Sequence, residues 1–595
     1  MTNQFAIGID LGTSTSEICV FRDGQPYSIP DPGTKIPIIP SIFAINPKGQ
    51  FLVGESARNR VDLEAPKGVK HGIREVKRQM GTSGMIELLG EKYRPEEISE
   101  KILRKLRDNA EEALGETIQE VVLSVPANFD NAARQATLDA AKLAGLKIIR
   151  LINEPTAAAL AFGFKNIDVE EQLVVFDFGG GTLDITVLEM ISGLLDVKCS
   201  FGDRYLGGKD FDEKLIELIL RKFQEEYPNI QISENSQRAL KGEAEKTKII
   251  LSAHRSHTAH ISNFAVRSGE PIDLDVEVTR EEFERAIEPL LQRARECLQQ
   301  VLNAKQLKPS AIDRVLLVGG TTYIPAVRQL LAEFFGKEPK SDVVNPDLAV
   351  SIGASIEAAI RQGLIKEDTG IIMTDVSPFG LGIEVQEVDK HGKPIFQHGK
   401  PVLKYDSLIQ PNTTIPYITT KLYSLLHTEQ ESVKIHLYQD HLGKAELSSE
   451  AIDTEIVGVI EDIPKATNGV PYPVEVNFSY DNNGLVKLKA TIPDINKSLE
   501  ITYERPFVFS GNMTDKQIEK AIERGNITEA NNGTFDEFEG LLKSSKRLIK
   551  NLHEPESSRL TQAVTKLENA LTSGNTKEIE KSSKQLVNLN FDLRK

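Results

Sequence analysis

Cysteine and long apolar runs are both scarce in this sequence, and each shortage excludes a class of protein. The 595 residues include three cysteines, Cys19, Cys199 and Cys297, which lie far apart and without the spacing of metal ligands. Neither a disulfide framework nor a zinc site is therefore indicated. No stretch approaches the roughly 18 consecutive apolar residues of a membrane-spanning helix, so we expect no membrane partner.

A basic charge balance and a secretory leader pattern are missing too. The formal net charge of −16 argues against nucleic acid as the main partner, because polyanion binding needs a basic face. Residues 1–12 lead directly into an apolar run without the charged and then apolar pattern of a signal peptide, so we expect a cytoplasmic location. The chain is too long for one hydrophobic core, and we expect three or more domains.

One pattern occurs twice in the sequence: an apolar run, an Asp, a turn with Gly and Thr, and a second apolar run. The two copies span residues 7–20 and 174–187. A single Gly-rich turn is usually only a turn, but two copies indicate two similar lobes that face each other across a cleft. The Asp can hold a hydrated divalent cation, and the Gly and Thr let N–H and hydroxyl groups approach phosphate. The first candidates for a nucleotide site are Asp10, Thr13, Ser14, Thr15, Asp177, Gly179, Gly180, Gly181 and Thr182.

The texture of the sequence changes twice along the chain. Up to about residue 365, apolar runs alternate with helical patterns, which indicates an α/β architecture. After about residue 378, short runs of period two and turns such as 481–484 predict an antiparallel β domain. Beyond about residue 511, apolar residues recur at helical spacing. Residues 368–377 form either an interdomain linker or an edge strand.

Longer motifs in this order resemble the successive signatures of the seventy-kilodalton heat-shock chaperone family. They read IGIDLGTSTS, VVLSVPANFDNAARQAT, LINEPTAAALAFGF, VVFDFGGGTLDIT, YLGGKDFD, LLVGGTTYIP and NPDLAVSIGA. The resemblance implies an actin-like nucleotide-binding domain (1–367), a linker (368–377), a β-sandwich substrate-binding domain (378–510) and a helical lid (511–595). It also implies an ATP-dependent chaperone of protein folding and the stress response, whose ATP hydrolysis controls its affinity for extended hydrophobic segments of unfolded proteins.

The resemblance further implies ligands and partners. The ligands are ATP or ADP with Mg²⁺, and K⁺ is a candidate further cation. The partners are unfolded polypeptide segments, a J-domain co-chaperone and a nucleotide-exchange factor. Arg150, Asn153 and Thr156 fall where the family contacts J-domain proteins, although ordinary polar side chains would look the same.

The motifs of the resemblance also assign catalytic roles. Lys77 matches the family's catalytic lysine, and Glu154 matches the carboxylate beside the nucleophilic water. Without the family match, Lys77 is typical of a solvated surface charge and Glu154 of a helix-entry residue. The full predicted catalytic set is Lys77, Glu154, Asp177 and Thr182, and the predicted Mg²⁺ ligands, which act through bound water, are Asp10, Asp177 and Asp184.

The adenosine side of the site is predicted in two later motifs. Its expected residues are Glu245, Lys248, Ser252, Gly319 and Gly320. Glu245 and Lys248 lie at helical spacing, so an intrahelical ion pair is the alternative. Tyr323 stands where the family usually has an Arg that stacks on adenine. We expect the Tyr ring to stack on the base instead, with about 1 to 3 kcal/mol per base.

Three features relate to coupling between the domains. Pro126 and Arg134 match the family's proline switch and its arginine relay, and Asp375 matches the conserved end of its linker motif. Family linkers are leucine-rich before this Asp, whereas Thr374 places a hydroxyl there. We therefore expect weaker coupling between the domains.

The peptide-binding residues are predicted by alignment with the family. They are Ile383, Tyr423, Val433 and Ile435 as pocket residues, with Gln386 and Leu426 arching over the bound chain. These residues are equally typical of plain sandwich core. An extra stretch at 387–405, rich in Gly and Pro, predicts an elaborated loop or hairpin.

The predicted lid is about ten residues shorter than is usual for the family, and Gly and Asn residues weaken its early helical pattern. We therefore expect short peptide residence times. Two alternatives to the chaperone remain: a divergent holdase or nucleotide-exchange relative with weak coupling, and a small-molecule kinase on the actin-like fold.

Overall fold

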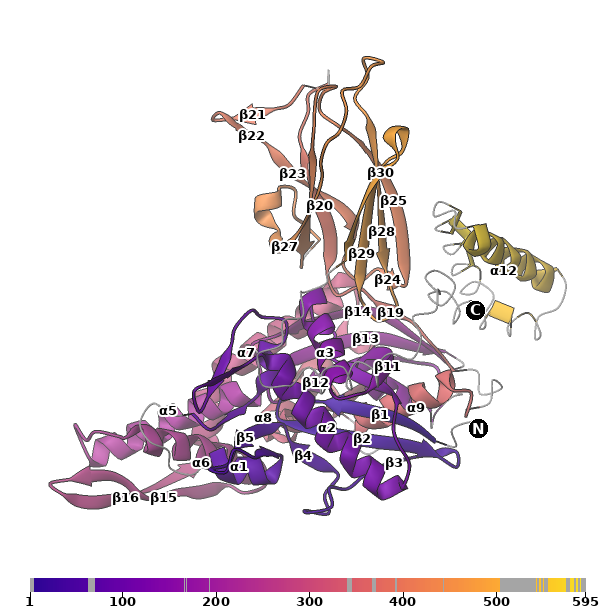
Figure 1. Ribbon diagram of the computed structural model, residues 1–595. Helices are drawn as coiled ribbons and strands as arrows, with labels where there is room; N and C mark the ends of the chain where they lie inside the picture. Colours follow the sequence, from indigo (N-terminus) through magenta and orange to yellow (C-terminus); the bar gives the residue numbers. More distant parts are fainter. Residues whose placement is uncertain are drawn as a thin grey trace. The chain divides into compact units, whose positions relative to one another are not determined.

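The computed structural model describes residues 5–61, 70–164, 166, 169–191, 193–339, 345–365, 371–390, 393–441, 443–502 and 555–573, with single positions and pairs between 542 and 589. The chain divides into two compact units that meet in sequence between Ile371 and Ile372. The first unit is α/β and the second is built mainly of antiparallel strands (Figure 1).

The first lobe of the first unit is built on a sheet with the strand order β11–β10–β1–β2–β3. Strands β1 and β2 form an antiparallel hairpin, and β10 and β11 continue the sheet in parallel from β1. β1 is buried along almost its whole length, which explains its continuous apolar run. The strands are β1 (Phe5–Leu11), β2 (Thr15–Arg22), β3 (Gln25–Ser28), β4 (Ile38–Pro40), β10 (Glu120–Val125) and β11 (Lys147–Asn153), and the helices beside them are α2 (Pro95–Leu114) and α3 (Asn131–Leu143).

The second lobe repeats this arrangement with a sheet that runs β17–β12–β13–β14. β12 and β13 form the second antiparallel hairpin, and β17 pairs with β12 in parallel, as β10 pairs with β1. The two sequence copies therefore form equivalent hairpins. The bounds are β12 (Glu171–Phe178), β13 (Leu183–Ile191), β14 (Leu194–Asp203), β17 (Arg314–Val318), α5 (Gly208–Glu226), α6 (Glu234–Ala253), β15 (Ser256–Arg267), β16 (Glu270–Thr279), α7 (Arg280–Ala304), η2 (Pro309–Ala311), η3 (Gly320–Tyr323) and α8 (Pro325–Phe335).

Two buried helices, α4 (Glu154–Gly163) and α9 (Ala349–Arg361), pack against each other, and α9 also packs on β1. Their backbones approach so closely that a Cβ on Gly353 would lie 1.7 Å from the Ala157 carbonyl oxygen. Only glycine fits at this crossing. Smaller elements complete the first lobe: β5 (Ile42–Ile45), β6 (Phe51–Val53), α1 (Glu55–Val61), β7 (Gly72–Arg74), η1 (Val76–Gln79), β8 (Ile86–Leu88) and β9 (Glu91–Tyr93).

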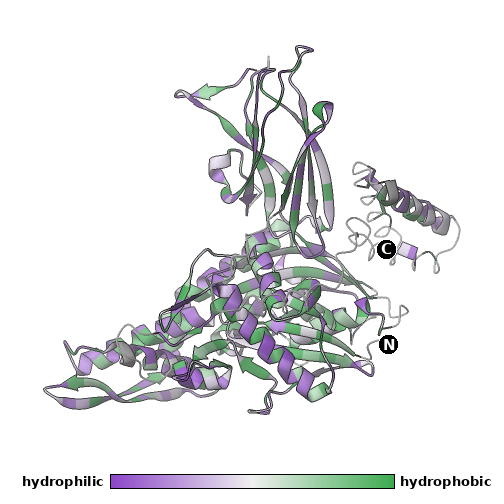
Figure 2. Cartoon of the chain, viewed as in Figure 1, coloured by the Kyte–Doolittle hydropathy of each residue, from purple (hydrophilic) through white to green (hydrophobic). Residues whose placement is uncertain are grey.

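The second unit is a sandwich of two antiparallel sheets, ordered β23–β20–β26–β27 and β25–β28–β29–β30. One apolar core lies between them, and hydrophobic and hydrophilic residues alternate along its strands (Figure 2). The sequence prediction of a β-sandwich is therefore correct. The bounds are β18 (Ile372–Met373), β19 (Asp375–Val376), β20 (Gly380–Gln386), β21 (Phe396–Gln397), β22 (Lys400–Pro401), β23 (Leu403–Ile409), β24 (Thr414–Ile415), β25 (Tyr417–Ser424), β26 (Val433–Asp440), η5 (Ser448–Glu450), β27 (Ile452–Ile460), β28 (Pro473–Tyr480), β29 (Val486–Ile492), η6 (Pro493–Ile495) and β30 (Lys497–Thr502).

Several predicted segments fall wholly or partly outside the described residues. They include the boundary at 510/511, linker residues 368–370 and most of the predicted lid. Within the lid, α12 (Glu556–Ser573) is helical, as its periodicity predicts. The remaining residues of the stretch at 368–377 contain the two-residue strands β18 and β19, and the interpretation as an interdomain linker stays a prediction.

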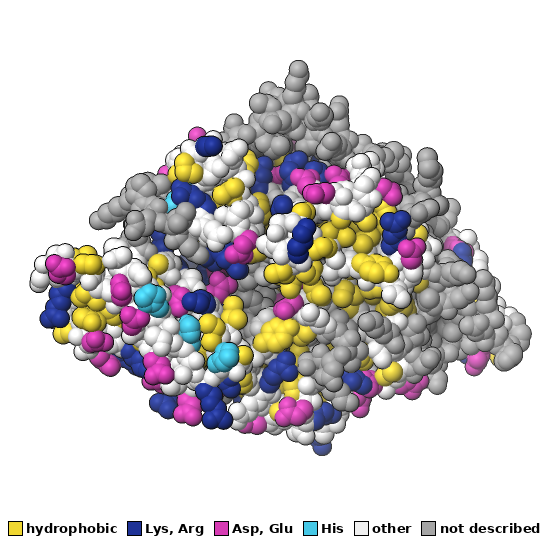
Figure 3. All heavy atoms as spheres, turned by 90° about the horizontal axis from the view of Figure 1, so that it is seen from below, with side chains coloured by type: hydrophobic (Ala, Val, Ile, Leu, Met, Phe, Trp, Pro, Cys, Tyr) yellow, Lys and Arg dark blue, Asp and Glu magenta, His cyan; other side chains and the backbone are white. Residues whose placement is uncertain are grey.

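The surface carries charges of both signs. On the face that Figure 3 shows, Lys and Arg side chains are interspersed with Asp and Glu side chains. Among the helices that the structure describes, none has both the length and the apolar character needed to cross a bilayer.

Candidate nucleotide site

The two predicted phosphate loops meet in the first unit. One follows Asp10 at the end of β1, and the other follows Asp177 near the end of β12. A Cβ on Gly180 would lie 1.9 Å from the Ser14 hydroxyl oxygen, so the loops face each other at close range. Glycine at this position keeps the backbone N–H groups accessible, as a phosphate site requires.

Lys77 and Glu154 form a buried ion pair next to these loops. Lys77 lies on η1, and its Nζ donates a hydrogen bond to Oε1 of Glu154, the first residue of α4. Lys77 is only 4% exposed, so the alternative of a solvated surface lysine is wrong. Glu75, which precedes η1, has the left-handed φ of 60°, which is rare outside glycine and accompanies functional turns.

Four carboxylates surround this lysine, and their protonation reflects the burial. Burial raises the pKa of Asp177 well above its ordinary value, and the charges of Glu154 and Asp184 add to the effect. Burial and the charge of Glu154 raise the pKa of Asp184 to about 7. The pKa values of Asp10 and Glu154 are also raised by burial, although Lys77 opposes the shift. The site therefore holds more carboxyl groups than one ammonium group can keep ionised, and a cation bound there would favour their charged form.

The residues present fit a hydrated Mg²⁺ ion. Neither carboxylate oxygen of buried Asp184 makes a hydrogen bond of normal geometry, so both are available to water on a cation. Within the described part of the chain, no three His, Cys, Asp or Glu side chains are close enough to ligate one ion directly. Asp10, whose Oδ1 accepts a 2.6 Å hydrogen bond from Ser124, therefore suits contact through bound water.

Arg78 is a residue of the site that the sequence reasoning missed. Its guanidinium donates to the Gly181 carbonyl oxygen at 2.6 Å and to Asp210 at 2.8 Å. Because Gly181 belongs to the second phosphate loop, Arg78 fixes this loop against η1. Its place directly after Lys77 was the available signal.

A pocket of about 330 Å³ lies where the adenosine side is predicted. Lys248 and Ser252 of α6, with Gly320 and Tyr323 of η3, line it. The structure does not bear out the alternative of a Glu245–Lys248 ion pair, because each pairs elsewhere. Glu245 contacts Arg74 at 3.2 Å, and Lys248 contacts Asp212 at 2.7 Å.

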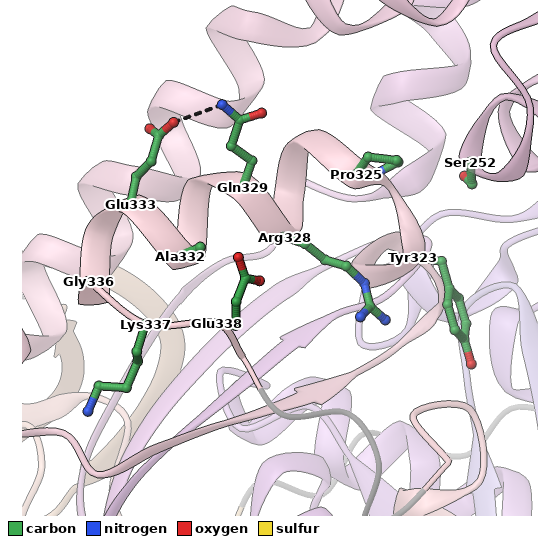
Figure 4. A pocket seen from close by; sticks show the side chains of 10 residues that line it. All are labelled: Ser252, Tyr323, Pro325, Arg328, Gln329, Ala332, Glu333, Gly336, Lys337 and Glu338. Carbon is green, nitrogen blue, oxygen red and sulfur yellow. Dashed lines mark hydrogen bonds between the residues drawn. The ribbon is translucent and has the colours of Figure 1, made fainter.

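Tyr323 and Ile249 are the two large apolar side chains of this pocket that remain exposed, by 40% and 62%. The Tyr323 hydroxyl donates to Asp347 at 3.2 Å, and burial together with the Asp347 charge raises its pKa to about 12. Beyond Tyr323 lies a wider hollow of about 950 Å³ along α8, into which Arg328 projects (Figure 4). Ile249 was missed, although its place next to Lys248 was the signal.

Arg134 connects the predicted proline switch with Glu154, the predicted catalytic glutamate. Its guanidinium donates to the Ala127 carbonyl oxygen, next to Pro126, and to Asn153 Oδ1 at 2.8 Å. Asn153 directly precedes Glu154 at the start of α4. Asn153 and Arg150 were expected to face a J-domain partner, but both make contacts within the first unit, Asn153 with Arg134 and Arg150 with Glu357 at 2.7 Å. Thr156 is buried as well.

The predicted peptide-binding residues lie in the second unit. Ile383 and Ile435 belong to the sandwich core, and Tyr423 and Val433 pack against it. Leu426 is partly exposed, and its main-chain N–H donates to the Gln430 side chain at 2.9 Å. The structure thus gathers four of the six residues in one core, which leaves both the pocket and the plain-core interpretations open.

Two further predicted residues make contacts that the sequence did not indicate. The Gln386 side chain, expected to arch over the peptide, donates to the Ile395 carbonyl oxygen at 3.2 Å in the extra stretch. The Asp375 carboxylate accepts a hydrogen bond from the Val376 N–H at 2.8 Å.

Comparisons with known proteins all match this chain to one family of chaperones. A family model described as Hsp70 protein matches residues 6–87 and 83–594. Chaperone protein DnaK of Metamycoplasma hominis is 35% identical over 603 residues, which cover 99% of this chain and 95% of the relative. Chaperone protein DnaK of Thermotoga petrophila is 37% identical over 531 residues (87% and 83%), and that of Mycoplasma mobile is 36% identical over 526 residues (88% and 81%).

Proposed function

The chain belongs to the Hsp70 family, and on that premise we propose which of its residues perform the family's ATPase cycle. The protein is an ATPase and an ATP-dependent chaperone, with an actin-like ATPase part and a sheet-rich substrate-binding part. The holdase and small-molecule kinase alternatives are not favoured.

We propose that the two hairpin loops hold the phosphates of ATP. The backbone N–H groups at 12–15 and 180–182 and the hydroxyls of Thr13 and Thr182 are the donors, whereas the Gly179 N–H donates to the Thr182 oxygen within the loop. Mg²⁺, held through water by Asp10, Asp177 and Asp184, supplies charge neutralisation for the phosphates. Lys248, Ser252 and Gly320 bind the adenosine side, with Ile249 and Tyr323 against the faces of the base.

The buried Lys77–Glu154 pair is the observation that carries the proposal. The Glu154 carboxylate is placed to orient a water molecule, and the Lys77 ammonium offsets the charge that develops on the transferred phosphoryl group. Both groups are held by main-chain elements, η1 and the first turn of α4, so little reorganisation is needed during reaction.

The wider cycle is proposed on the same basis. Extended segments of unfolded proteins bind in the sandwich near Ile383 and Val433, under a lid formed by residues 511–595, and ATP hydrolysis changes their affinity through Pro126, Arg134 and the linker at 368–377. A J-domain co-chaperone and a nucleotide-exchange factor drive the cycle in the cytoplasm. K⁺ is a candidate second cation at the nucleotide site. We also propose that the protein acts in the stress response.

Single-turnover ATP hydrolysis by the full chain, with and without an unfolded peptide and a J-domain protein, tests this assignment. We expect both additions to stimulate the wild type. Lys77→Met should lower the hydrolysis rate at least about 100-fold and change ATP affinity much less, because the lysine acts mainly on developing charge.

The matched control is Lys147→Met, which removes a lysine from the exposed pair with Glu120. It should hydrolyse ATP like the wild type. Hydrolysis by Lys77→Met within threefold of the wild type would refute the assigned role of the buried pair.

A further inference from the structure

A hairpin arm, residues 387–404, leaves the sandwich between β20 and β23. Its two sides are joined by main-chain hydrogen bonds, from the Glu387 N–H to the Val402 oxygen at 2.9 Å and from the Val402 N–H to the Ile395 oxygen at 3.0 Å. The paired strands β21 and β22 form its end and extend away from the sandwich (Figure 1). The arm is therefore an ordered hairpin that is held by its own main-chain hydrogen bonds.

The base of the arm is fixed to the sandwich by side chains. Gln386, the last residue of β20, donates its amide to the oxygens of Ile395 at 3.2 Å and Val402 at 3.4 Å. Lys404 forms an ion pair with Glu387 at 2.6 Å. These contacts join both sides of the arm to β20, the strand that carries Ile383. They therefore fix the base of the arm beside that strand.

The exposed part of the arm combines an aromatic ring with unpaired positive charge. Phe396 of β21 is 61% exposed. Lys390, Lys393 and Lys400 are exposed as well, and among the described residues none of these three has an ion-pair partner. The arm carries four lysines against two acidic residues, in a chain whose net charge is −16.

We propose that this arm binds an acidic, extended stretch of an unfolded client, next to the apolar residues that the sandwich holds. The proposal rests on the proposed function, since it places the client near Ile383. An extended chain advances roughly 3.3 Å per residue, so client residues a few positions beyond those near Ile383 would pass the arm, which begins directly after Gln386. The lysines attract carboxylates and repel basic flanks, and Phe396 offers an apolar contact beside them.

Peptides with one shared apolar core and different flanks test the arm. The flanks are Asp/Glu, Ser or Lys, and binding to the full chain in ADP is measured by fluorescence anisotropy. The acidic peptide should bind about tenfold more tightly than the basic one at low salt, and the difference should shrink in 0.5 M salt, on the order of what exposed charge pairs and screening predict. Equal affinities for the acidic and basic peptides would overturn the proposal.

Lys393→Glu/Lys400→Glu should abolish or reverse the flank preference and leave the Ser-flanked peptide unaffected. The matched control is Lys487→Glu/Lys489→Glu, which makes the same charge change at exposed positions of β29 in the other sheet. This control should keep the flank preference. If the control variant also loses the preference, the preference comes from the long-range charge of the protein and not from the arm, and the proposal is refuted.

Two more outcomes separate the alternatives. If the wild type fails to bind even the Ser-flanked peptide, the proposed function fails, and the arm proposal falls with it. If the arm variant keeps the flank preference but loses binding to vesicles of anionic lipid, the arm serves a membrane surface and the client proposal is wrong.

Discussion

The Lys77–Glu154 pair shows how single residues set the chemistry of the site. Burial alone would lower the pKa of Lys77, but the charges of Glu154 and Asp10 raise it above its ordinary value, so the lysine stays charged. A buried charge is tolerated only with partners, and removing one partner leaves the other uncompensated. The excess of carboxylates over this lysine explains why the site suits a cation.

Tyr323 and Ile249 are predicted to hold the adenine base between them. Tyr323→Ala should weaken ATP binding by about 1 to 3 kcal/mol, because a stacked aromatic face is lost. Tyr323→Phe keeps the ring and loses the hydroxyl that donates to Asp347, so its affinity should stay near that of the wild type. Titration with a fluorescent ATP analogue measures both variants.

Ile249→Ser offers an independent check on the same pocket. It should also lower the affinity for ATP, whereas Val266→Ser, at another exposed apolar position in the first unit, should leave that affinity unchanged. Unchanged ATP affinity in Tyr323→Ala would mean that the ring does not contact the base.

The residues that sequence reasoning found and missed differ in one physical respect. Asp10, Thr13 and Asp177 stand in a motif whose local geometry suffices for their role. The burial of Lys77 depends on Glu154, 77 positions away, so local pattern favours the surface and only the family resemblance indicated the pair. Ile249 has no distinguishing local pattern in the sequence. Its place in the pocket depends on η3 lying beside α6 in the folded chain.

At the scale of elements, α9 is tied to the first lobe by a buried charge cluster. Glu357 of α9 contacts Arg150 of β11 and Arg361 of its own helix, each at 2.7 Å. Burial alone would raise the pKa of Glu357, but the two arginines lower it below its ordinary value of 4.5. The cluster therefore stabilises the folded state fully above pH 4.5, and this stability is lost as the pH falls through the lowered value.

Glu357→Gln should lower the free energy of unfolding by about 3 kcal/mol near pH 7, because the buried guanidinium of Arg150 loses its counter-charge and the partly exposed Arg361 loses its ion pair. The difference from the wild type should shrink progressively below pH 4.5, where the Glu357 carboxyl of the unfolded chain takes up a proton, and should vanish as the pH falls through the lowered pKa of the folded state. Calorimetric unfolding midpoints of the full chain across pH 3.5 to 8 measure this.

Glu120→Gln is the matched control, since its pair with Lys147 is partly exposed and should contribute less than about 1 kcal/mol. A Glu357→Gln deficit that stays constant across this pH range would contradict the electrostatic explanation.

Elements with strong local signals were predictable, and their contacts were not. The two hairpins, the α/β alternation and an antiparallel β domain follow from periodicity and turns, whereas the sandwich followed from the family resemblance, and the stretch at 387–405 was correctly placed as a loop or hairpin. The attachment of Gln386 to Ile395 and Val402 was missed, because it depends on which backbone oxygens the folded arm leaves facing that amide.

At the scale of the whole molecule, a continuous set of contacts leads from Glu154, the proposed catalytic glutamate, to the proposed switch at Pro126. Glu154 follows Asn153, whose side chain accepts from Arg134, and Arg134 donates to Ala127 beside Pro126. A change at the γ-phosphate that moves Glu154 would therefore act on the Pro126 turn. Coupling of this kind is reciprocal, so bound peptide must alter ATP occupancy by the same free energy.

The predicted linker at 368–377 is expected to determine how strongly ATP hydrolysis and peptide binding are coupled. Ile371 is buried, whereas Thr374 adds a hydroxyl to a segment that the resemblance expects to be apolar. Thr374→Leu should raise the factor by which peptide stimulates ATP hydrolysis by about fivefold, because the burial of a larger apolar side chain contributes on the order of 1 kcal/mol. Basal hydrolysis without peptide should change little.

The measurement compares single-turnover rates with and without peptide in both proteins. Thr565→Leu makes the same substitution at an exposed position of α12 and should leave the stimulation factor unchanged. Reciprocity gives a second readout, since ATP should also accelerate peptide release more in Thr374→Leu than in the wild type. If neither quantity moves, the hydroxyl at position 374 does not limit coupling, and the limit lies within the Pro126–Arg134 contacts.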